Sequence, residues 1–354
     1  MQRAIEAARA ARGRTSPNPW VGAAVVRDGQ IISVGATAPP GGPHAEAAAL
    51  ANADARGATL YTTLEPCMPF AGKRTRPCTE AILEAGITKV VVGLEDPHSP
   101  VAGQGVALLR AKGVEVEVGD GAEEVARLLR PYLHYRQRGR PYIIAKFAVS
   151  LDGKVGAPSA GVRWLTGATA LERAHQDRAW VDAIAVGSGT VLADDPALTA
   201  RIQGQPAERQ PLRIVLDGRG RTPADAKVLG SGAIVATQGG DAAWQRAVAA
   251  TGATVLHIEP DGVTLNLDQL LVALGQRSVM SLIVEGGPTL LGSLFEQELV
   301  NEVHAYIAPI VLGPEGLPLF ADAGAFAPER LREVEIEVLS PDVLVRGYTG
   351  GWTS

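Results

Sequence analysis

Four side chains in the first third of the chain could together hold a metal ion and move a proton. His44 and Glu46 are separated by one residue, Cys67 follows Glu65-Pro66, and Cys78 is the second of only two cysteines in the chain. Two thiolates and one neutral imidazole balance the charge of Zn²⁺ and leave its fourth tetrahedral position open, which is typical of catalytic zinc sites. Such an ion lowers the pKa of a bound water to near neutrality. These residues therefore predict a hydrolytic zinc centre.

Glu46 indicates which hydrolysis this centre would perform. The spacing H-x-E, followed by P-C and a later Cys, is the signature of the zinc deaminases, in which the glutamate carries protons and is not a ligand. The geometry requires His44 at the non-helical start of its helix. We expect all three ligands at or near helix starts, where the helix dipole lowers the pKa of a thiol. The alternative is that Cys67 and Cys78 are inert core residues and His44 lies at the surface.

The loop between the two cysteines is long and basic. Ten residues, 68–77, separate the cysteines, whereas the short form of the signature has two. The loop contains Lys73, Arg74 and Arg76. Cations beside the metal would suit a phosphorylated substrate, and the alternative is a solvated, charged loop.

Alternating strand and helix patterns fill residues 1–121. The segment 21–26 is β-branched, Asp28-Gly29 supplies a tight turn, and 31–34 forms the return strand. Residues 1–14 are Arg-rich like a transit peptide, but their apolar spacing favours the first helix of a domain. These patterns predict a sheet of about five strands with helices on its faces. Further strands are expected at 58–64, 89–92 and 114–118, and further helices at 44–53, 79–85 and 106–112.

A basic segment that contains Gly and Pro follows a predicted helix over 123–138 and indicates a domain boundary. We therefore expect two domains, 1–139 and 140–354. Several strands of the second domain are continuous apolar runs, which is typical of a sheet covered on both faces. These strands are expected at 142–149, 181–186, 212–216, 233–236, 254–258, 280–284 and 303–307.

Two Gly-rich turns follow buried strands in the second domain. They read Gly187-Ser-Gly-Thr190 and Glu285-Gly-Gly-Pro288. Backbone N–H groups in such turns, helped by the start of a following helix, can approach a phosphate. Neither turn has the G-x-G-x-x-G spacing, so a Rossmann fold is not indicated.

Composition excludes several classes of protein. The chain has 354 residues and a formal net charge of −5, whereas a nucleic-acid-binding protein usually carries a basic excess, so no nucleic-acid partner is expected. No stretch approaches the roughly 20 apolar residues that span a bilayer, so no membrane partner is expected either. Two cysteines are too few for a disulfide scaffold, which favours a cytoplasmic location.

Six segments in fixed order carry a family resemblance. They read Pro17-Asn-Pro-Trp-Val-Gly22, Pro43-His-Ala-Glu46, Thr63-Leu-Glu-Pro-Cys67, Ser150-Leu-Asp-Gly153, Gly189-Thr-Val-Leu-Ala-Asp-Asp-Pro196 and Glu285-Gly-Gly-Pro-Thr-Leu-Leu-Gly292. Together they resemble the bifunctional deaminase–reductase family of riboflavin biosynthesis, and the match covers nearly the whole chain.

The resemblance implies an α/β fold with a cytidine-deaminase-like three-layer domain followed by a dihydrofolate-reductase-like domain. The first domain would hydrolyse an amino group from 2,5-diamino-6-(5-phosphoribosylamino)pyrimidin-4-one. The second would use NADPH to reduce the ribosyl group of the product to ribityl. Members of the family tend to form homodimers or higher homo-oligomers through the reductase domain.

The resemblance also implies roles for individual residues. Zinc would be held by His44, Cys67 and Cys78, with Glu46 as the catalytic proton carrier. Asn18 and Asp96 would contact the substrate of the deaminase, and Arg178, Leu198, Arg201 and Glu285 that of the reductase. NADPH would be lined by Val149, Trp164, Thr190, Asp194, Gly287, Pro288, Thr289, Leu290, Leu291, Gly292 and Ser293. Asp194, Glu285 and Lys146 are the candidate proton donors of the reduction.

Departures from the family pattern keep alternatives open. The loop 68–77 lacks the usual histidine, Thr37 stands where many members have a histidine, and Val162 replaces a substrate-binding serine. One alternative is a reductase-only protein with a structural zinc domain. Others are a paralogue acting on a related aminopyrimidine, and a nucleoside or tRNA deaminase fused to an oxidoreductase, which the negative charge disfavours.

Overall fold

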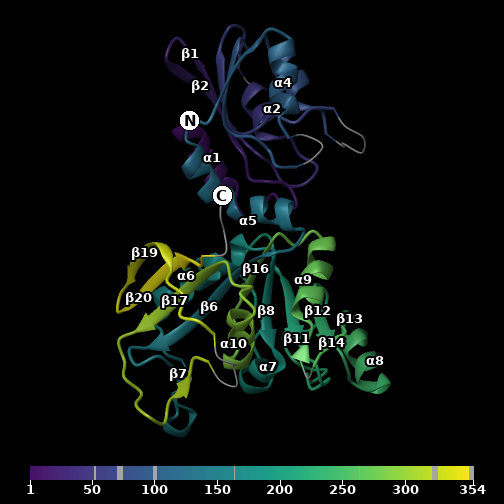
Figure 1. Ribbon diagram of the computed structural model, residues 1–354, viewed down its shortest axis with the longest axis vertical. Helices are drawn as coiled ribbons and strands as arrows, with labels where there is room; N and C mark the ends of the chain where they lie inside the picture. Colours follow the sequence, from purple (N-terminus) through teal and green to yellow (C-terminus); the bar gives the residue numbers. More distant parts are fainter. Residues whose placement is uncertain are drawn as a thin grey trace. The chain divides into compact units, whose positions relative to one another are not determined.

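The chain forms two compact units, Met1–Gly139 and Arg140–Ser354 (Figure 1). The computed structural model describes residues 1–51, 53–69, 75–98, 102–162, 164–262, 264–320 and 326–350. The division falls where helix α5 (Ala122–Arg138) ends at Gly139, whose φ of 68° is left-handed. Glycine adopts this conformation without steric cost and commonly ends helices.

The first unit is built on a five-stranded sheet with strand order β2-β1-β3-β4-β5. The first hairpin is antiparallel, and β3, β4 and β5 run parallel. Asp28 and Gly29 join the hairpin with φ angles of 49° and 75°, which is the geometry that the Asp-Gly turn predicts. The strands are β1 (Gly22–Arg27), β2 (Gln30–Ala36), β3 (Thr59–Leu64), β4 (Lys89–Leu94) and β5 (Glu115–Val118).

Helices cover both faces of this sheet. A Cβ at Gly22 would lie 1.9 Å from the carbonyl oxygen of Ala4, and one at Gly35 would lie 2.3 Å from the amide nitrogen of Ala49. Gly22 pairs with Ala36, so Gly22 and Gly35 point to opposite faces. The predicted three-layer architecture is therefore confirmed. The helices besides α5 are α1 (Gln2–Ala11), α2 (Ala45–Leu50), α3 (Cys78–Glu84) and α4 (Gln104–Ala111).

The second unit is built on a nine-stranded sheet with order β13-β12-β11-β8-β16-β6-β17-β20-β19. The strands from β13 to β17 run parallel, and β20 and β19 add an antiparallel hairpin. All seven predicted strands are present, whereas the sequence analysis missed β19 and β20. The strands are β6 (Tyr142–Ser150), β8 (Ala183–Gly187), β11 (Leu212–Leu216), β12 (Ala233–Thr237), β13 (Thr254–His257), β16 (Ser281–Val284), β17 (Glu302–Ala308), β19 (Arg332–Leu339) and β20 (Asp342–Tyr348).

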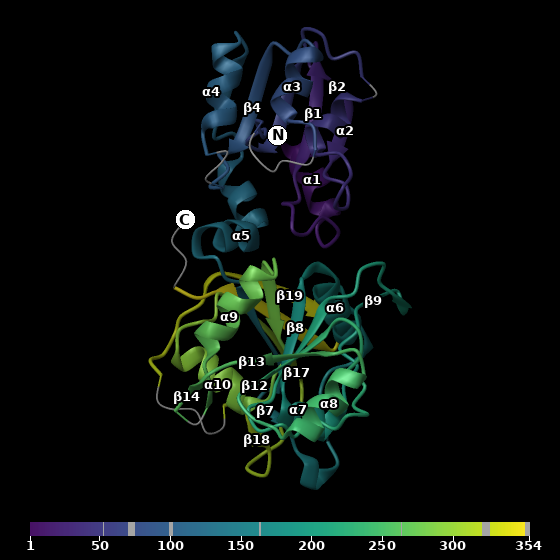
Figure 2. The ribbon, with the colours of Figure 1, turned by 90° about the vertical axis from the view of Figure 1, so that its right-hand side faces the viewer.

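The expectation that this sheet is covered on both faces is confirmed. Ile143 and Ala145 pack with residues of α9 and α10, whereas Ile144 packs with residues of α7 and α8. Figure 2 shows α9 and α10 on one side of the sheet and α7 and α8 on the other. The helices are α6 (Ala168–Trp180), α7 (Ser188–Asp194), α8 (Ala242–Ala250), α9 (Leu267–Gln276) and α10 (Pro288–Glu296), with a 3₁₀ turn at Pro158–Ala160.

Short strands border the large sheet in two-stranded pairs, β10 with β9, β14 with β15 and β18 with β7. The short strands are β7 (Lys154–Gly156), β9 (Arg201–Ile202), β10 (Gln205–Pro206), β14 (Pro260–Asp261), β15 (Thr264–Leu265) and β18 (Leu317–Pro318).

Among the described residues, no helix has both the length and the apolar character needed to cross a bilayer.

Candidate zinc centre and reductase site

His44, Cys67 and Cys78 form a nearly equilateral triangle. The His44 Nδ1 atom lies 3.5 Å from Cys67 Sγ and 3.4 Å from Cys78 Sγ, and the two sulfur atoms are 3.3 Å apart. Zinc–sulfur bonds of about 2.3 Å and zinc–nitrogen bonds of about 2.0 Å in a tetrahedron require edges of about 3.5 to 3.8 Å. The three side chains therefore fit a zinc ion with one position open.

The local structure around the triangle matches the expectation in part. His44 is the N-cap of α2 with an extended backbone, and Cys78 is the first residue of α3. Cys67 lies in the segment after β3, so the expectation that it sits at a helix start is wrong. The hydroxyl of Thr75 lies 3.3 Å from His44 Nε2, the ring nitrogen turned away from the thiols. A partner on that nitrogen helps to fix the ring for metal binding.

The expected lowering of the thiol pKa is also wrong for Cys78. The hydrogen bond with Cys67 raises the pKa of the Cys78 thiol, and burial and the nearby Glu46 carboxylate raise it further. A cation at the centre of the triangle would offset these effects, because it favours the ionised form of both thiols.

Glu46 lies beside the triangle without belonging to it. Its side chain is buried, and its Oε2 atom is 3.4 Å from Cys78 Sγ. Burial, and then the negative charge of Cys67, raise the pKa of Glu46 to about 7. A carboxyl group that titrates near neutral pH can both accept and donate a proton.

Glu65 ties the zinc segment to two neighbouring elements, a role that the sequence analysis did not assign. The buried carboxylate accepts backbone N–H bonds from Gly103 at 2.8 Å, Asp96 at 3.2 Å and Val106 at 3.0 Å. Gly103 is the N-cap of α4 and has no capping side chain, so Glu65 replaces the cap. Its partners lie 31 to 41 residues away, and no local pattern could have revealed them.

The two residues expected at the substrate of the deaminase lie in different settings. Asp96 is buried, and its carboxylate accepts from the Tyr132 hydroxyl at 2.9 and 3.1 Å and from the His98 amide at 2.9 Å. Asn18 is half-buried in a turn closed by its own backbone and Thr15.

The departures from the family pattern have structural counterparts. The Thr37 hydroxyl is buried and bonds to the main chain of Val21. Arg76 of the basic loop forms an ion pair with Glu84 of α3. Lys73 and Arg74 lie outside the described residues. In the described part of the loop, this ion pair supports the alternative that Arg76 is a solvated surface charge.

In the second unit, Glu285 joins two cations at the end of β16. Arg178 of α6 donates from Nε and Nη2 to the two carboxylate oxygens, each at 2.7 Å, and Lys146 of β6 lies 3.5 Å away. Arg178 also donates to the carbonyl oxygen of Thr199, next to the buried Leu198. Burial would raise the pKa of Glu285, but Lys146 and Arg178 lower it to about 2.

The two Gly-rich turns lie side by side. A Cβ at Gly287, the N-cap of α10, would lie 3.2 Å from Thr190 Oγ1, whereas one at Gly187 or Gly189 would meet nothing within 4 Å. The turns follow the neighbouring parallel strands β8 and β16. Crevices at the carboxyl ends of parallel strands are common ligand sites, and open glycine backbone admits a phosphate. This cradle fits a nicotinamide dinucleotide.

The other expected cofactor and substrate residues differ in exposure. Trp164 is 78% exposed, and Asp194 and Arg201 are also exposed. Val149 is buried near the end of β6. Along α10, Thr289 is exposed, Pro288, Leu290 and Ser293 are half-buried, and Leu291 and Gly292 are buried.

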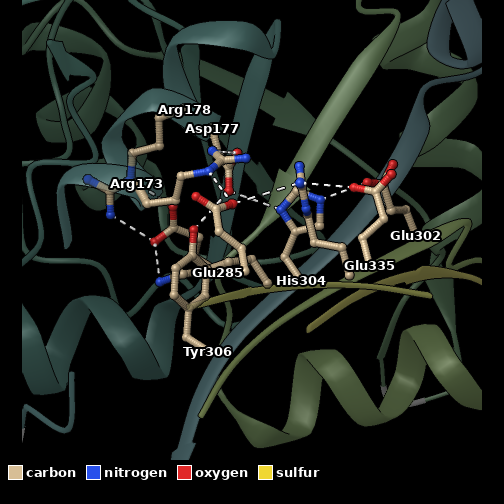
Figure 3. A network of polar contacts seen from close by, with 11 residues as sticks. Arg173, Asp177, Arg178, Glu285, Glu302, His304, Tyr306 and Glu335 are labelled. Carbon is tan, nitrogen blue, oxygen red and sulfur yellow. Dashed lines mark hydrogen bonds and ion pairs between the residues drawn. The ribbon is translucent and has the colours of Figure 1, made fainter. Parts of the chain in front are cut away.

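A second network of charged side chains, from α6 and β17, lies near Arg178 and Glu285 (Figure 3). The buried Asp177 accepts from the Tyr306 hydroxyl at 2.9 Å, lies 3.0 Å from His304 Nδ1, and forms an ion pair with Arg173. The Nε2 atom of His304 is 2.7 Å from Glu302. Burial would lower the pKa of His304, but Asp177 and Glu302 raise it to about 9. No local sequence pattern predicts this network, because its residues belong to separate segments.

The folds and sites define a zinc-dependent deaminase unit joined to a nicotinamide-dependent reductase unit. The family description "RibD C-terminal domain" matches residues 141–345, and "Cytidine and deoxycytidylate deaminase zinc-binding region" matches residues 1–94. The chain belongs to the RibD family, the bifunctional deaminases and reductases of riboflavin biosynthesis, whose cofactors are Zn²⁺ and NADPH.

Full-length relatives carry this assignment. The riboflavin biosynthesis protein RibD of Bacillus amyloliquefaciens is 37% identical, with 97% of this chain and 94% of the relative covered. The Escherichia coli protein is 38% identical, with 97% and 96% covered. The solved RibD structure from Acinetobacter baumannii is 35% identical and superposes with a TM-score of 0.88 over 98% of this chain and 97% of the other.

Glu65 provides a test of how the zinc centre is held. In Glu65→Gln, an amide N–H₂ group replaces one of the two oxygens that receive three backbone N–H donors. We expect about 10- to 100-fold weaker zinc binding, as for other partners that orient ligands, and unchanged reductase activity. Competition with a chelator measures the zinc affinity. The matched control is Glu80→Gln, exposed and two residues from Cys78; wild-type zinc affinity in Glu65→Gln contradicts the role.

His304 predicts a pH-dependent stability of the second unit. Its folded pKa of about 9 lies above the ordinary value of about 6.5. Its contribution is therefore complete below about pH 6.5 and is lost as the pH rises through 9. We expect the free energy of unfolding to fall by about 3 kcal/mol across this window, and the fall to disappear in His304→Gln.

Denaturant titrations at several pH values measure this effect. The exposed His257, changed to Gln, is the control that should retain the wild-type pH profile. A wild-type protein equally stable at pH 6.5 and 9.5 contradicts the protonated state of His304.

Proposed function

We propose that the chain deaminates 2,5-diamino-6-(5-phosphoribosylamino)pyrimidin-4-one and then reduces the ribosyl group of the product to ribityl with NADPH. The observation that carries the proposal is the triangle of His44, Cys67 and Cys78 beside the buried Glu46. A solved Thermotoga maritima structure described as a diaminohydroxyphosphoribosylaminopyrimidine deaminase/5-amino-6-(5-phosphoribosylamino)uracil reductase supports this substrate. It is 33% identical, with a TM-score of 0.85 over 99% of this chain and 97% of the other.

We assign deamination to residues 1–139 and reduction to residues 140–354. The division of the chain into two compact units supports this assignment, as do the two family matches on either side of Gly139.

In the deaminase, His44, Cys67 and Cys78 would hold zinc, and zinc would activate a water for attack. Water adds to the ring carbon that bears the amino group. Glu46 takes the two protons of this water in turn and delivers one to the adjacent ring nitrogen and one to the amino nitrogen, which leaves as ammonia while the oxygen stays on the carbon as a carbonyl. We propose Asn18 and Asp96 as the residues that orient the pyrimidine.

In the reductase, Arg178, Leu198, Arg201 and Glu285 would hold the substrate. Lys146 and Arg178 carry two positive charges against the single negative charge of Glu285, and the excess suits a phosphorylated ligand. Glu285 enters the reaction as a carboxylate, because its pKa is about 2, and the Lys146 side chain lies 3.5 Å from it.

NADPH supplies the hydride, and the protein aligns it with the sugar. We propose that the cofactor phosphates lie between the two Gly-rich turns, where glycine backbone leaves open space. The proposed cofactor residues are Val149, Trp164, Thr190, Asp194, Gly287, Pro288, Thr289, Leu290, Leu291, Gly292 and Ser293.

Glu46→Gln separates the two activities. An amide cannot accept and return a proton, so we expect NADPH oxidation from the diamino substrate to fall at least 100-fold. Oxidation with the deaminated compound should stay at the wild-type rate, which serves as the internal control. Unchanged oxidation of NADPH with the diamino substrate contradicts the role of Glu46. A wild-type protein that responds only to the deaminated compound would be a reductase-only member of the family.

We also propose that the protein is cytoplasmic and that copies of the chain pair through the second unit. The two free cysteines support a reducing location. Val334, Ile336 and Val338 on the edge strand β19 are 50%, 70% and 74% exposed. They alternate with Glu335 and Glu337, which face arginines, so the apolar side chains lie together on the other face. Contiguous exposed apolar surface marks interaction sites.

Ile336→Glu tests the proposed pairing, because a charge in an apolar contact between copies is strongly unfavourable. We expect the sedimentation mass to fall from that of a dimer or larger assembly to that of one chain. The control is Val272→Glu, at a position on α9 that is exposed to a similar degree to Val334. An unchanged mass for Ile336→Glu contradicts pairing through this face.

A further inference from the structure

Lys146 has a second partner besides Glu285. Lys146 of β6 and Tyr306 of β17 project to the same face of adjacent parallel strands, since Lys146 pairs with His304 and Ala148 pairs with Tyr306. The Lys146 ammonium lies 5.3 Å from the centre of the Tyr306 ring. This is within the roughly 6 Å over which an aromatic face attracts a cation.

The Tyr306 ring is held in place from the other side. It is buried, and its hydroxyl donates to Asp177 at 2.9 Å. Asp177 is in turn held by Arg173 and His304, which are themselves buried. Figure 3 shows the Tyr306 hydroxyl turned toward Asp177, with His304 between Asp177 and Glu302. The ring cannot turn away from Lys146 without leaving a buried carboxylate with one donor fewer.

We propose that Tyr306 is a positioning residue of the reductase, which acts by holding the Lys146 ammonium in place for the substrate. A lysine side chain is flexible, and its ammonium carries three donors. Glu285 is the only carboxylate within 4 Å of Lys146 among the residues that the structure describes. The ammonium lies 3.5 Å from Glu285, whose two oxygens already accept from Arg178 at 2.7 Å, and the aromatic face gives it a second, neutral partner. Donors are then left for the phosphorylated pyrimidine.

Two variants separate the ring from the hydroxyl. Tyr306→Leu removes the aromatic face, and we expect the KM for the deaminated pyrimidine and its calorimetric Kd to rise about tenfold. Tyr306→Phe keeps the face and should restore both to within about threefold of wild type. The Kd for NADPH and the deaminase activity should stay unchanged in both, because neither involves Lys146. An equal loss in the Leu and Phe variants would overturn the proposal.

A double-mutant cycle with Lys146→Met tests whether Tyr306 acts through Lys146, and it rests on the proposed function. We expect Tyr306→Leu to raise the KM about tenfold in the wild-type background and less than twofold in the Lys146→Met background. The same increase in both backgrounds would make Tyr306 a packing residue and overturn the proposal. A Lys146→Met single variant with wild-type KM and Kd would instead overturn the placement of Lys146 in the substrate site.

Discussion

Two thiols, an imidazole and a carboxyl group meet within hydrogen-bonding distance in the first unit, and a bound cation would stabilise this cluster. Cys67, burial and Glu46 raise the pKa of the Cys78 thiol, and burial and then Cys67 raise that of Glu46. A cation at the centre would favour the ionised form of both thiols. The end of β3 and the starts of α2 and α3 bring these side chains together. Glu65 stabilises this arrangement, because its carboxylate accepts a hydrogen bond from the start of α4.

In the second unit, arginine, lysine and histidine side chains rather than a metal ion stabilise the negative charges. Two carboxylates there have cations against them: Glu285 has Arg178 and Lys146, and Asp177 has Arg173 and His304. Burying a charge is costly unless it is paired and hydrogen-bonded. The pairing lowers the pKa of Glu285 to about 2 and raises that of His304 to about 9. The charge states of these side chains are thus set by contacts between helix α6, strands β6 and β17, and the end of β16.

Much of this architecture was predictable from local patterns. The Asp28-Gly29 hairpin, the five-stranded sheet and the seven apolar strands of the second unit follow from turn chemistry and continuous apolar runs. Strand β19 was missed because it is an edge strand whose two faces carry glutamates and exposed β-branched residues. A strand without a buried face gives little of the apolar signal that identified the others.

By itself, the sequence predicted the candidate metal ligands and the candidate proton carrier, because His44, Glu46, Cys67 and Cys78 form a pattern typical of the zinc deaminases. It also determined the order of the two units and the Gly-rich turns. Only the tertiary structure decided that Glu65 caps α4 and that Tyr306 lies between Asp177 and Lys146. Contacts between residues tens to more than a hundred positions apart depend on strand order and register. Strand order and register cannot be recognised from the residues of any single segment.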